Sequence, residues 1–394
     1  MSEVIRDRQE VARPPIITVA QSFDGLRLAW AECMQGDPEA TYFSSLDWLE
    51  TWWRCMGRGG TLYCLLAWWE QRLVAAGALL LSGSFPAVLG FVGSPESDYG
   101  DFVVDERIWP RRTAVWSLLD HAASALPRAV FHLEQLPERS GASDAVTSWA
   151  KTRNRTVRKN GRVSCHYYEL PNSVTSYERS LPKRMLVAER RLLRRLAERG
   201  QVRFCDKLYG EATWADVRQE LAEVDHRRDR NRSVQVWGGE SGRWLGEAVR
   251  RAATSHALWM LALRVDKQIV AYFLGFEYRG VLYAYTQSYD ENYSQQAPGF
   301  LLSLHTHRLA ITHGLSLYDH LRGDEPYKRQ WMTGSSVNSS LLLIPRTFVP
   351  SRACLFAIFW VRKSWRWEAR RMRSLVQRRL TRGVIGEVMK WSSD

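Results

Sequence analysis

Residues 318–331 (YDHLRGDEPYKRQW) bring together the side chains of this sequence that are best suited to chemistry. Asp324 or Glu325 could accept a proton from an amine nucleophile, because carboxylates act as general bases. Lys328 could neutralise a phosphate or a developing oxyanion, and the planar guanidinium of Arg322 could orient an anionic substrate. A solvated surface turn has the same composition, so the neighbouring elements must decide between the two interpretations.

A helix start that favours anions precedes this stretch. The loop YDENYSQQAPG leads into a helix predicted over residues 299–313, and Pro298 and Gly299 lie where that helix begins. Unpaired backbone N–H groups and the positive end of the helix dipole therefore point outward there. This arrangement predicts a site for a pyrophosphate or another anion, although an ordinary Pro-Gly helix start has the same sequence.

The predicted elements put the charged stretch at the end of a strand. Apolar patterning predicts a meander of strands over residues 258–265, 269–278 and 281–289, and another strand over 315–320 after the helix. Ligands of α/β sheets usually lie at the carboxyl ends of strands. The charged stretch is therefore a candidate wall of a ligand cleft.

The rest of the chain alternates between predicted helices and strands, which indicates mixed α/β layers. Two helical patterns lie within residues 23–56, and the second has Ser45 as its N-cap and Gly57 as its stop. The other predicted helices cover residues 108–125, 143–152, 183–200, 214–225 and 242–255. The other predicted strands cover residues 129–136, 163–170 and 202–205 and a hairpin over 61–81.

Two hairpin sequences resemble each other across the chain. LLAWWEQRLVA (65–75) and LALRVDKQIVA (261–271) align without gaps, and each has apolar strands around an acidic and polar turn. Any two hairpins are similar at this level. Because the order of the following helices and strands is also similar, we predict two related halves.

Composition restricts the classes of protein to consider. The chain of 394 residues is long enough for two domains, and its 6 cysteines lack metal-ligand or disulfide spacing. The 9 histidines lack HxxxH or HExxH spacing, so we expect no metal site. The first residues lack an apolar signal segment, and no apolar run has the length of about 20 residues that spans a membrane. We therefore expect a cytoplasmic protein.

The net charge of +13 is concentrated near the C-terminus. Residues 346–394 hold 12 Lys and Arg against 3 Asp and Glu, interleaved with aromatic residues. Such a tail could lie on an anionic membrane surface, or it could fold back on the body. We do not expect nucleic-acid binding, because the basic excess is not on the body of the protein.

Several motifs together resemble one enzyme family. They are YD at 289–290, APGFLL at 297–302, DHLRGDEPYK at 319–328, the basic helix at 183–200, YFSSLDWLETWW at 42–53 and SDYGDFVVD at 97–105. These resemble the GNAT-superfamily acyltransferases found with cellulose and exopolysaccharide biosynthesis genes (the CelD-like type), which are related to the Fem aminoacyl transferases. The resemblance covers about residues 40–335. It departs at Ala297, where the family often has serine.

The resemblance implies a tandem GNAT-like α/β fold, in which two mixed-sheet halves pack across a cleft, with acyl-CoA as donor. The residues expected to bind the donor are Tyr285, Gln296, Pro298, Gly299 and Phe300. The residues expected on the acceptor side are Asp324, Lys328 and Tyr327 for catalysis, and Asp319, Arg322 and Glu325 for substrate binding. Residues 97–99 could also reach the cleft. Which carboxylate acts as the base stays open.

The resemblance also implies the domain boundaries. We expect a lead-in over residues 1–20, a GNAT-like domain over 21–172, a second GNAT-like domain with the active site over 173–345, and the basic tail over 346–394.

The predicted function is transfer of an acyl group, with acetyl as the expected one, from acyl-CoA to an amine or hydroxyl. The family association suggests an amino sugar or polysaccharide precursor as acceptor. One alternative is a Fem-like transferase that moves an aminoacyl group from tRNA to a cell-wall precursor. Another is a noncatalytic scaffold in a polysaccharide-synthesis complex.

Overall fold

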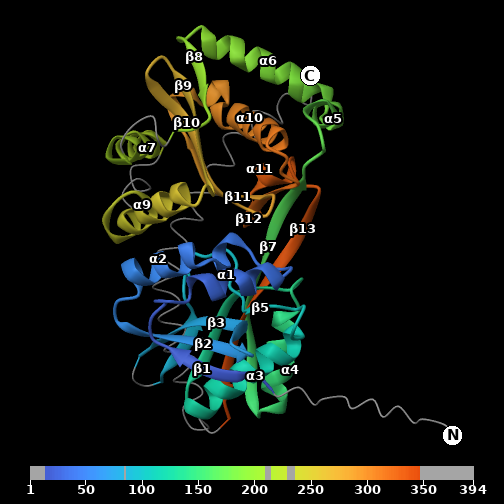
Figure 1. The fold of residues 1–394 in the computed structure, drawn as a ribbon. Coiled ribbons are helices and arrows are strands. Elements are labelled where there is room, and N and C mark those ends of the chain that lie inside the picture. The colour runs from blue at the N-terminus through green and yellow to red at the C-terminus, as the bar shows by residue number, and fades with distance from the viewer. Residues whose placement is uncertain (1–13, 84–85, 209–213, 229–235, 347–394) are drawn as a thin grey trace, which may run out of the picture.

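A computed structural model describes residues 14–83, 86–208, 214–228 and 236–346, which fold around one mixed sheet (Figure 1). The described residues form a 13-stranded sheet in the order β1-β2-β3-β4-β6-β13-β7-β12-β11-β10-β9-β8, and β5 pairs with β3 beside this path. The strands are β1 (Ile16–Ala20), β2 (Gly60–Trp69), β3 (Arg72–Ser82), β4 (Val88–Phe91), β5 (Val103–Val104), β6 (Val130–Pro137), β7 (Arg155–Glu169), β8 (Val202–Cys205), β9 (Leu258–Val265), β10 (Gln268–Tyr278), β11 (Val281–Tyr289), β12 (Leu317–Arg322) and β13 (Gly334–Pro345).

Helices cover both faces of this sheet (Figure 1). The α-helices are α1 (Arg27–Gly36), α2 (Leu46–Met56), α3 (Arg111–Ala125), α4 (Ala142–Thr152), α5 (Val174–Ser180), α6 (Lys183–Ala197), α7 (Trp214–Arg228), α9 (Gly239–Thr254), α10 (Pro298–Thr312) and α11 (Pro326–Arg329). The short 3-10 helices are η1 (Tyr42–Ser44) and η2 (Glu291–Gln296). In the described part of the chain, no helix combines the length and the apolar character that crossing a membrane requires.

Local sequence signals predicted these elements well where capping and turn residues were present. Ser45 caps α2 by accepting a hydrogen bond from the Trp48 N–H, and Gly57 ends the helix. Glu70 and Gln71 form the turn between β2 and β3, with φ values of 46° and 66°. A two-residue hairpin turn needs such left-handed residues to match the twist of its strands.

The two halves of the chain repeat the same order of elements. The first half runs β1, α1, α2, β2, β3, β4, α3, β6, α4, β7, apart from the short β5 and η1. After α5 and α6, which follow β7 and have no counterpart in the first half, the second half runs β8, α7, α9, β9, β10, β11, α10, β12, α11, β13, apart from η2. The two similar hairpin sequences are β2–β3 and β9–β10, so they occupy equivalent places in the two halves.

Each half ends in a strand that lies against the other half. β13 pairs with β6 of the first half, and β7 pairs with β12 of the second half. β7 and β13 also pair with each other along most of their length. The exchange joins the two half-sheets by backbone hydrogen bonds and brings the end of β12 close to the first half.

The exchanged strands are where the sequence-based prediction was wrong. β7 begins at Arg155, well before the strand predicted from residue 163, and β13 was not predicted. Residues 155–162 (RTVRKNGR) and the first residues of β13 (GSSVNSS) are polar and lack apolar alternation. Residues 155–159 pair with residues 341–345, and the polar start of β13 pairs with residues 161–167, so each polar segment becomes a strand beside a partner from a distant part of the chain.

Aromatic packing joins the halves on one face of the sheet. The indole rings of Trp48 in α2 and Trp244 in α9 meet edge to face, with centroids 5.0 Å apart. Tyr42 stacks on Phe276 at 4.6 Å. Aromatic pairs contribute about 0.5–1.5 kcal/mol each beyond the burial of their area. The halves therefore share one hydrophobic core on this face.

Candidate active site

The centre of the candidate site is a split between two neighbouring parallel strands. β11 and β12 pair only over Val281–Tyr283 and Leu317–Asp319. Beyond Tyr283, β11 continues along β10, whereas β12, which pairs with β7 over Leu317–Asp319, pairs with β7 again at Arg322. Leu321 has φ of 59°, and the register of β12 shifts between Asp319 and Arg322, so a local bulge bends the strand away. The strands thus open a wedge at their carboxyl ends.

The loop after β11 leads to an open helix N-terminus beside this wedge. The buried Asp290 begins η2 by accepting a hydrogen bond from the Asn292 N–H at 3.0 Å. Ala297 then adopts the left-handed conformation with φ of 43°, and Pro298 is the first residue of α10. No side chain caps this end of α10. Pro298 has no N–H, and the Phe300 and Leu301 N–H groups donate to the Ala297 carbonyl at 3.0 and 3.2 Å. An anion would therefore meet the Gly299 N–H and the positive end of the helix dipole.

The residues around this helix start leave space for a ligand. A Cβ atom added to Gly299 would have only ordinary contact with Tyr289, at 3.4 Å. Gln296 Oε1 is buried and has no hydrogen-bond partner in the described structure. A buried amide without a partner costs free energy, and a ligand with a complementary polar group would recover it. These features fit a phosphate-bearing donor with amide groups.

The other residues predicted to bind the donor have different surroundings. Tyr285 lies on β11 beyond the split, and its hydroxyl is 3.5 Å from the Glu96 carbonyl of the first half. Phe300 stacks on Trp331 with ring centroids 5.7 Å apart, and Pro298 is buried at the start of α10. Pro298 and Phe300 thus shape the helix start through packing.

Asp319 is the last paired residue of β12 before the wedge, and it is almost completely buried. Its carboxylate accepts hydrogen bonds from the Tyr99 hydroxyl at 2.7 Å and the Leu321 N–H at 2.8 Å. Burial raises the pKa of Asp319 above its ordinary value, and the Tyr99 hydrogen bond offsets part of this rise. A carboxylate with a raised pKa is suited to accept a proton near neutral pH.

A loop of the first half clamps the end of β12. Arg322 forms an ion pair with Asp98 at 2.7 Å and donates a hydrogen bond to the Pro95 carbonyl at 2.6 Å. Together with Tyr99, these contacts tie residues 95–99 to the two ends of the bulge in β12. The first half therefore supplies part of the site, in agreement with the expectation that residues 97–99 reach the cleft.

Lys328 is buried and its ammonium is fully engaged. It forms an ion pair with Glu325 at 2.8 Å and donates to the carbonyls of Arg322 at 2.8 Å and Leu321 at 3.4 Å. An ammonium has three N–H donors, and these three acceptors account for all of them. The geometry favours a positioning role, in which Lys328 and Glu325 fix α11 against the bulge of β12.

Asp324 and Tyr327 differ in exposure. Asp324 is exposed and binds Arg329 at 2.7 Å and His166 at 3.1 Å. The hydrogen bonds from Arg329 and His166 lower the pKa of Asp324, so it is a weaker proton acceptor than Asp319. Tyr327 is half-buried on α11, and its phenol interacts electrostatically with the Lys328 ammonium.

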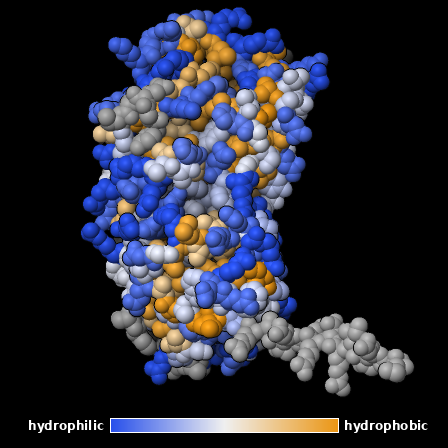
Figure 2. Space-filling model, viewed as in Figure 1, coloured by the Kyte–Doolittle hydropathy of each residue, from blue (hydrophilic) through white to orange (hydrophobic). Residues whose placement is uncertain are grey.

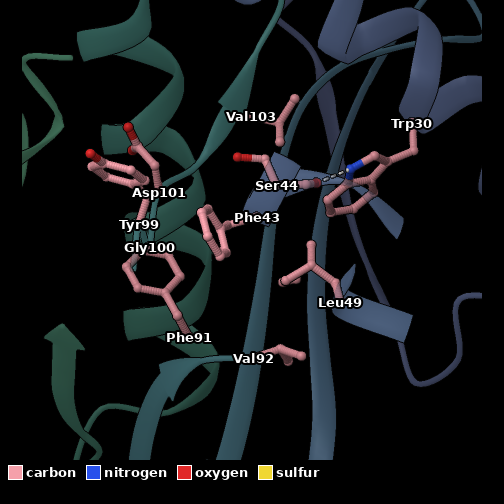
Figure 3. A pocket seen from close by; sticks show the side chains of 11 residues that line it. Trp30, Phe43, Ser44, Leu49, Phe91, Val92, Tyr99, Gly100, Asp101 and Val103 are labelled. Atoms are coloured by element: carbon pink, nitrogen blue, oxygen red, sulfur yellow. Dashed lines mark hydrogen bonds between the residues drawn. The ribbon is translucent and has the colours of Figure 1, made fainter. Parts of the chain in front are cut away.

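A small pocket lies behind Tyr99 in the first half, and Figure 3 shows the side chains around it. Its lining includes Trp30, Phe43 and Asp101, and burial raises the pKa of Asp101 to about 6. Nearby, α3 of the first half begins with the buried Arg111, which pairs with Asp37 and Asp101. α3 corresponds to α10, so buried charge pairs occupy the place where the second half has an open helix start.

A buried histidine on α10 predicts how stability depends on pH. His307 accepts or donates a hydrogen bond at 2.9 Å to the Tyr177 hydroxyl, and burial lowers its pKa from 6.5 to about 3. The unfolded chain therefore binds a proton that the folded chain excludes as the pH falls below 6.5. We expect the free energy of unfolding to drop by about 2 kcal/mol between pH 7 and pH 5 from this group.

Chemical denaturation at a series of pH values tests this expectation. His307→Gln should reduce the slope of the free energy of unfolding against pH by the amount that corresponds to one bound proton. His313→Gln, at the exposed end of the same helix, should leave this slope as in the unchanged protein. Equal slopes for the two variants would contradict the assignment.

The described residues contain no group of three or more His, Cys, Asp or Glu side chains that could hold a metal ion. Sequence reasoning did not identify Glu96, whose carbonyl lies 3.5 Å from the Tyr285 hydroxyl, or Arg139, whose guanidinium lies 5.7 Å from the centre of the Tyr99 ring, because no motif marks either residue.

Comparisons with known proteins agree with this geometry. Residues 188–329 match the family model described as an acetyltransferase (GNAT) domain. The fold is similar to the crystal structure of FemX, with a TM-score of 0.57 and 10% identity over 84% of this chain and 98% of that chain. It is also similar to a conserved protein of unknown function from Bacteroides thetaiotaomicron, with a TM-score of 0.53 and 12% identity over 84% of this chain and 100% of that chain. The comparison with curated proteins finds no match.

These findings confirm the predicted fold and the general class of activity. Residues 188–329 of the second half match an acetyltransferase (GNAT) domain, the described residues have a tandem GNAT-like fold, and together these findings support an acyltransferase enzyme. The narrower likeness to the cellulose-associated type, the domain boundaries and the roles of individual residues stay predictions. The basic tail beyond Arg346 lies outside the described residues.

Proposed function

We propose that this acyltransferase moves an acyl group, with acetyl as the expected one, from acyl-CoA to an amine or hydroxyl held where the two halves meet. The single observation that carries the proposal is the wedge between β11 and β12, which opens beside the uncapped start of α10. A helix start binds the pyrophosphate of a nucleotide donor, and a wedge in a sheet can admit the extended arm that carries the thioester.

The acceptor side of the wedge combines residues of both halves. Asp319 and Arg322 come from β12, and Asp98 and Tyr99 come from the loop that closes over it. This surface is rich in buried charge and hydrogen-bonding groups, which suits a polar acceptor such as an amino sugar or another glycan precursor.

The proposed mechanism uses two groups near the end of β12. Asp319 takes the proton from the attacking amine or hydroxyl as the new C–N or C–O bond forms and the thioester C–S bond breaks. Tyr327 donates its phenol proton to the departing CoA thiolate and regains a proton from solvent, while Asp319 releases the one it accepted. Holding donor and acceptor in line supplies much of the remaining rate enhancement.

The donor site is tested by placing a negative charge at the helix start. Gly299→Asp should fit sterically, and a carboxylate in the first turn of α10 should leave stability unchanged or raise it slightly. The same carboxylate repels a pyrophosphate, so we expect the affinity for acetyl-CoA in calorimetry to fall at least about tenfold. Gly299→Ala is the matched control and should bind within a few-fold of the unchanged protein.

Three results of this calorimetry separate the candidate functions. Absence of binding by the unchanged protein to both acetyl-CoA and long-chain acyl-CoA would overturn the proposal. Binding without turnover on any amine or hydroxyl acceptor would favour a noncatalytic scaffold in a polysaccharide-synthesis complex. Equal affinity of Gly299→Asp and Gly299→Ala would remove the α10 start from the donor site.

A second candidate function is transfer of an aminoacyl group from tRNA to a cell-wall precursor. The observation that favours it is the similarity of 84% of this chain to the fold of FemX. Transfer of a radiolabelled amino acid that requires charged tRNA, together with absence of acyl-CoA binding, would replace the first proposal by this one.

A further inference from the structure

The exposed face of α6 carries cations near both ends of the helix, with the exposed Val187 between them. The apolar and basic side chains of α6 lie on different faces, and Leu192 and Leu196 are buried against the core on one of them. The basic residues of the exposed side, which we name the α6 ridge, are Lys183, Arg184, Arg190, Arg194 and Arg195. Hydrophilic residues accordingly predominate along the upper edge of the molecule, where α6 lies (Figures 1 and 2).

The helix itself gains little from these charges. No acidic residue lies in its first turn, where Lys183 and Arg184 face the positive end of the helix dipole. Arg190 and Arg194 are four residues apart and repel each other. The one carboxylate of α6, Glu189, turns away from the ridge to pair with Arg308 of α10. Arg194 and Arg195 lie in the last turn, where cations favour the helix dipole, so the cost to the helix falls on Lys183 and Arg184. Exposed cations at the unfavourable end of the helix indicate a role in binding an anionic partner.

The ridge ends at the proposed donor site. Arg199, just beyond the end of α6, donates to the Asn292 carbonyl at 2.9 Å and lies 4.2 Å from the centre of the Tyr293 ring. Both residues belong to η2, the segment that leads directly into the open start of α10. At 1.5 Å per residue, the 15 residues of α6 extend about 22 Å away from this point.

Carboxylates beside the ridge restrict the kind of anionic partner. Glu178 and Asp206 are well exposed, with side-chain exposures of 41% and 46%, and Glu198 follows the end of α6. A long polyanion such as RNA, or a flat anionic membrane, would bring charge against these carboxylates as well. A folded partner with one acidic helix can pair its carboxylates with the cations of α6 and stay clear of the carboxylates beside the ridge.

We propose that the α6 ridge docks a small acidic carrier protein that delivers the acyl group as a thioester on its phosphopantetheine arm. The inference rests on the proposed acyl-transfer function and concerns the source of the donor. The phosphate of the arm takes the same place at the start of α10 as a CoA phosphate. The body of the carrier then lies outside the wedge, against α6, and its charges pair with the ridge.

Binding of a labelled carrier tests the proposal without knowledge of the acceptor. An acetyl-loaded type II acyl carrier protein, labelled for fluorescence anisotropy, is titrated with the unchanged protein and with Arg190→Glu/Arg194→Glu. We expect saturable binding that weakens with added salt and at least about tenfold in the charge-reversal variant, because rim charges steer and hold such complexes. Arg58→Glu/Arg128→Glu, which reverses two exposed charges of the first half, should bind the carrier normally.

Parallel titrations separate this proposal from the function on which it rests. All three proteins should bind acetyl-CoA with equal affinity, because the ridge lies outside the CoA site. The carrier proposal would be overturned if the carrier did not bind, or bound equally to the two double variants. Normal binding of acetyl-CoA in the same experiment would leave the proposed acyl-transfer function standing. Ridge-dependent binding to phosphatidylglycerol vesicles or to tRNA, without carrier binding, would overturn it in favour of those partners.

Discussion

Asp319→Asn is expected to lower turnover by about 10²–10⁴-fold, the range that general-base catalysis contributes. The Tyr99 hydroxyl and the Leu321 N–H donate to different oxygens of Asp319. The amide oxygen can keep the bond from the Leu321 N–H, while the NH2 group can donate to the Tyr99 oxygen instead. The amide cannot take a proton from the attacking amine or hydroxyl. The measurement is release of the CoA thiol with an acceptor found in an amine and hydroxyl panel, together with a thermal melt that checks folding.

Asp324→Asn is the matched control, because it makes the same change on the same short segment. Asp324 is exposed and pairs with Arg329, so its replacement should change turnover by no more than a few-fold. A large loss in Asp324→Asn with nearly normal turnover in Asp319→Asn would reverse the assignment of the base.

Tyr99→Phe gives a pH readout that a purely structural role of Asp319 would not produce. The Tyr99 hydrogen bond lowers the pKa of Asp319, so its removal should raise that pKa further. Because the base must be ionised, the acid limb of kcat/KM should move to higher pH in Tyr99→Phe. An unchanged limb with a normal melt would separate Asp319 from the proton transfer.

Lys328→Met is expected to cost about 3–5 kcal/mol of the free energy of unfolding, the usual loss when one partner of a buried ion pair is removed. The thioether fills much of the same space but leaves Glu325 without its counter-charge. The carbonyls of Leu321 and Arg322 also lose their donor. Urea denaturation followed by circular dichroism measures the change.

Arg329→Met provides the control for this loss. Arg329 is one residue further along α11, but its pair with Asp324 is exposed, and such pairs contribute about 0–1 kcal/mol. Similar denaturation midpoints for Lys328→Met and Arg329→Met would show that Lys328 does not fix α11 against the bulge of β12. Full stability with lost turnover in Lys328→Met would support the catalytic role first expected for it.

Much of the fold could be predicted because its signals are local. The Ser45 cap, the Glu70-Gln71 turn, and the loop and helix from Asp290 to α10 each depend on a few adjacent residues. β7 and β13 could not be predicted with the same rules. Their polar segments become strands because β6, β12 and the two strands themselves, which are distant in the chain, supply the hydrogen-bond partners.

The sequence by itself determined which part of the chain carries the site. The Pro-Gly helix start and the charged stretch at 318–331 are adjacent in the chain order of a βαβ unit, so their proximity follows from short-range connections. Only the tertiary structure decided how the charged residues differ. Asp319 lies beneath Tyr99 of the other half, where burial raises its pKa, whereas Asp324 lies in solvent beside Arg329, where its pKa falls. The two carboxylates are five residues apart and chemically identical, and what distinguishes them is the loss of water imposed by a loop from the distant first half.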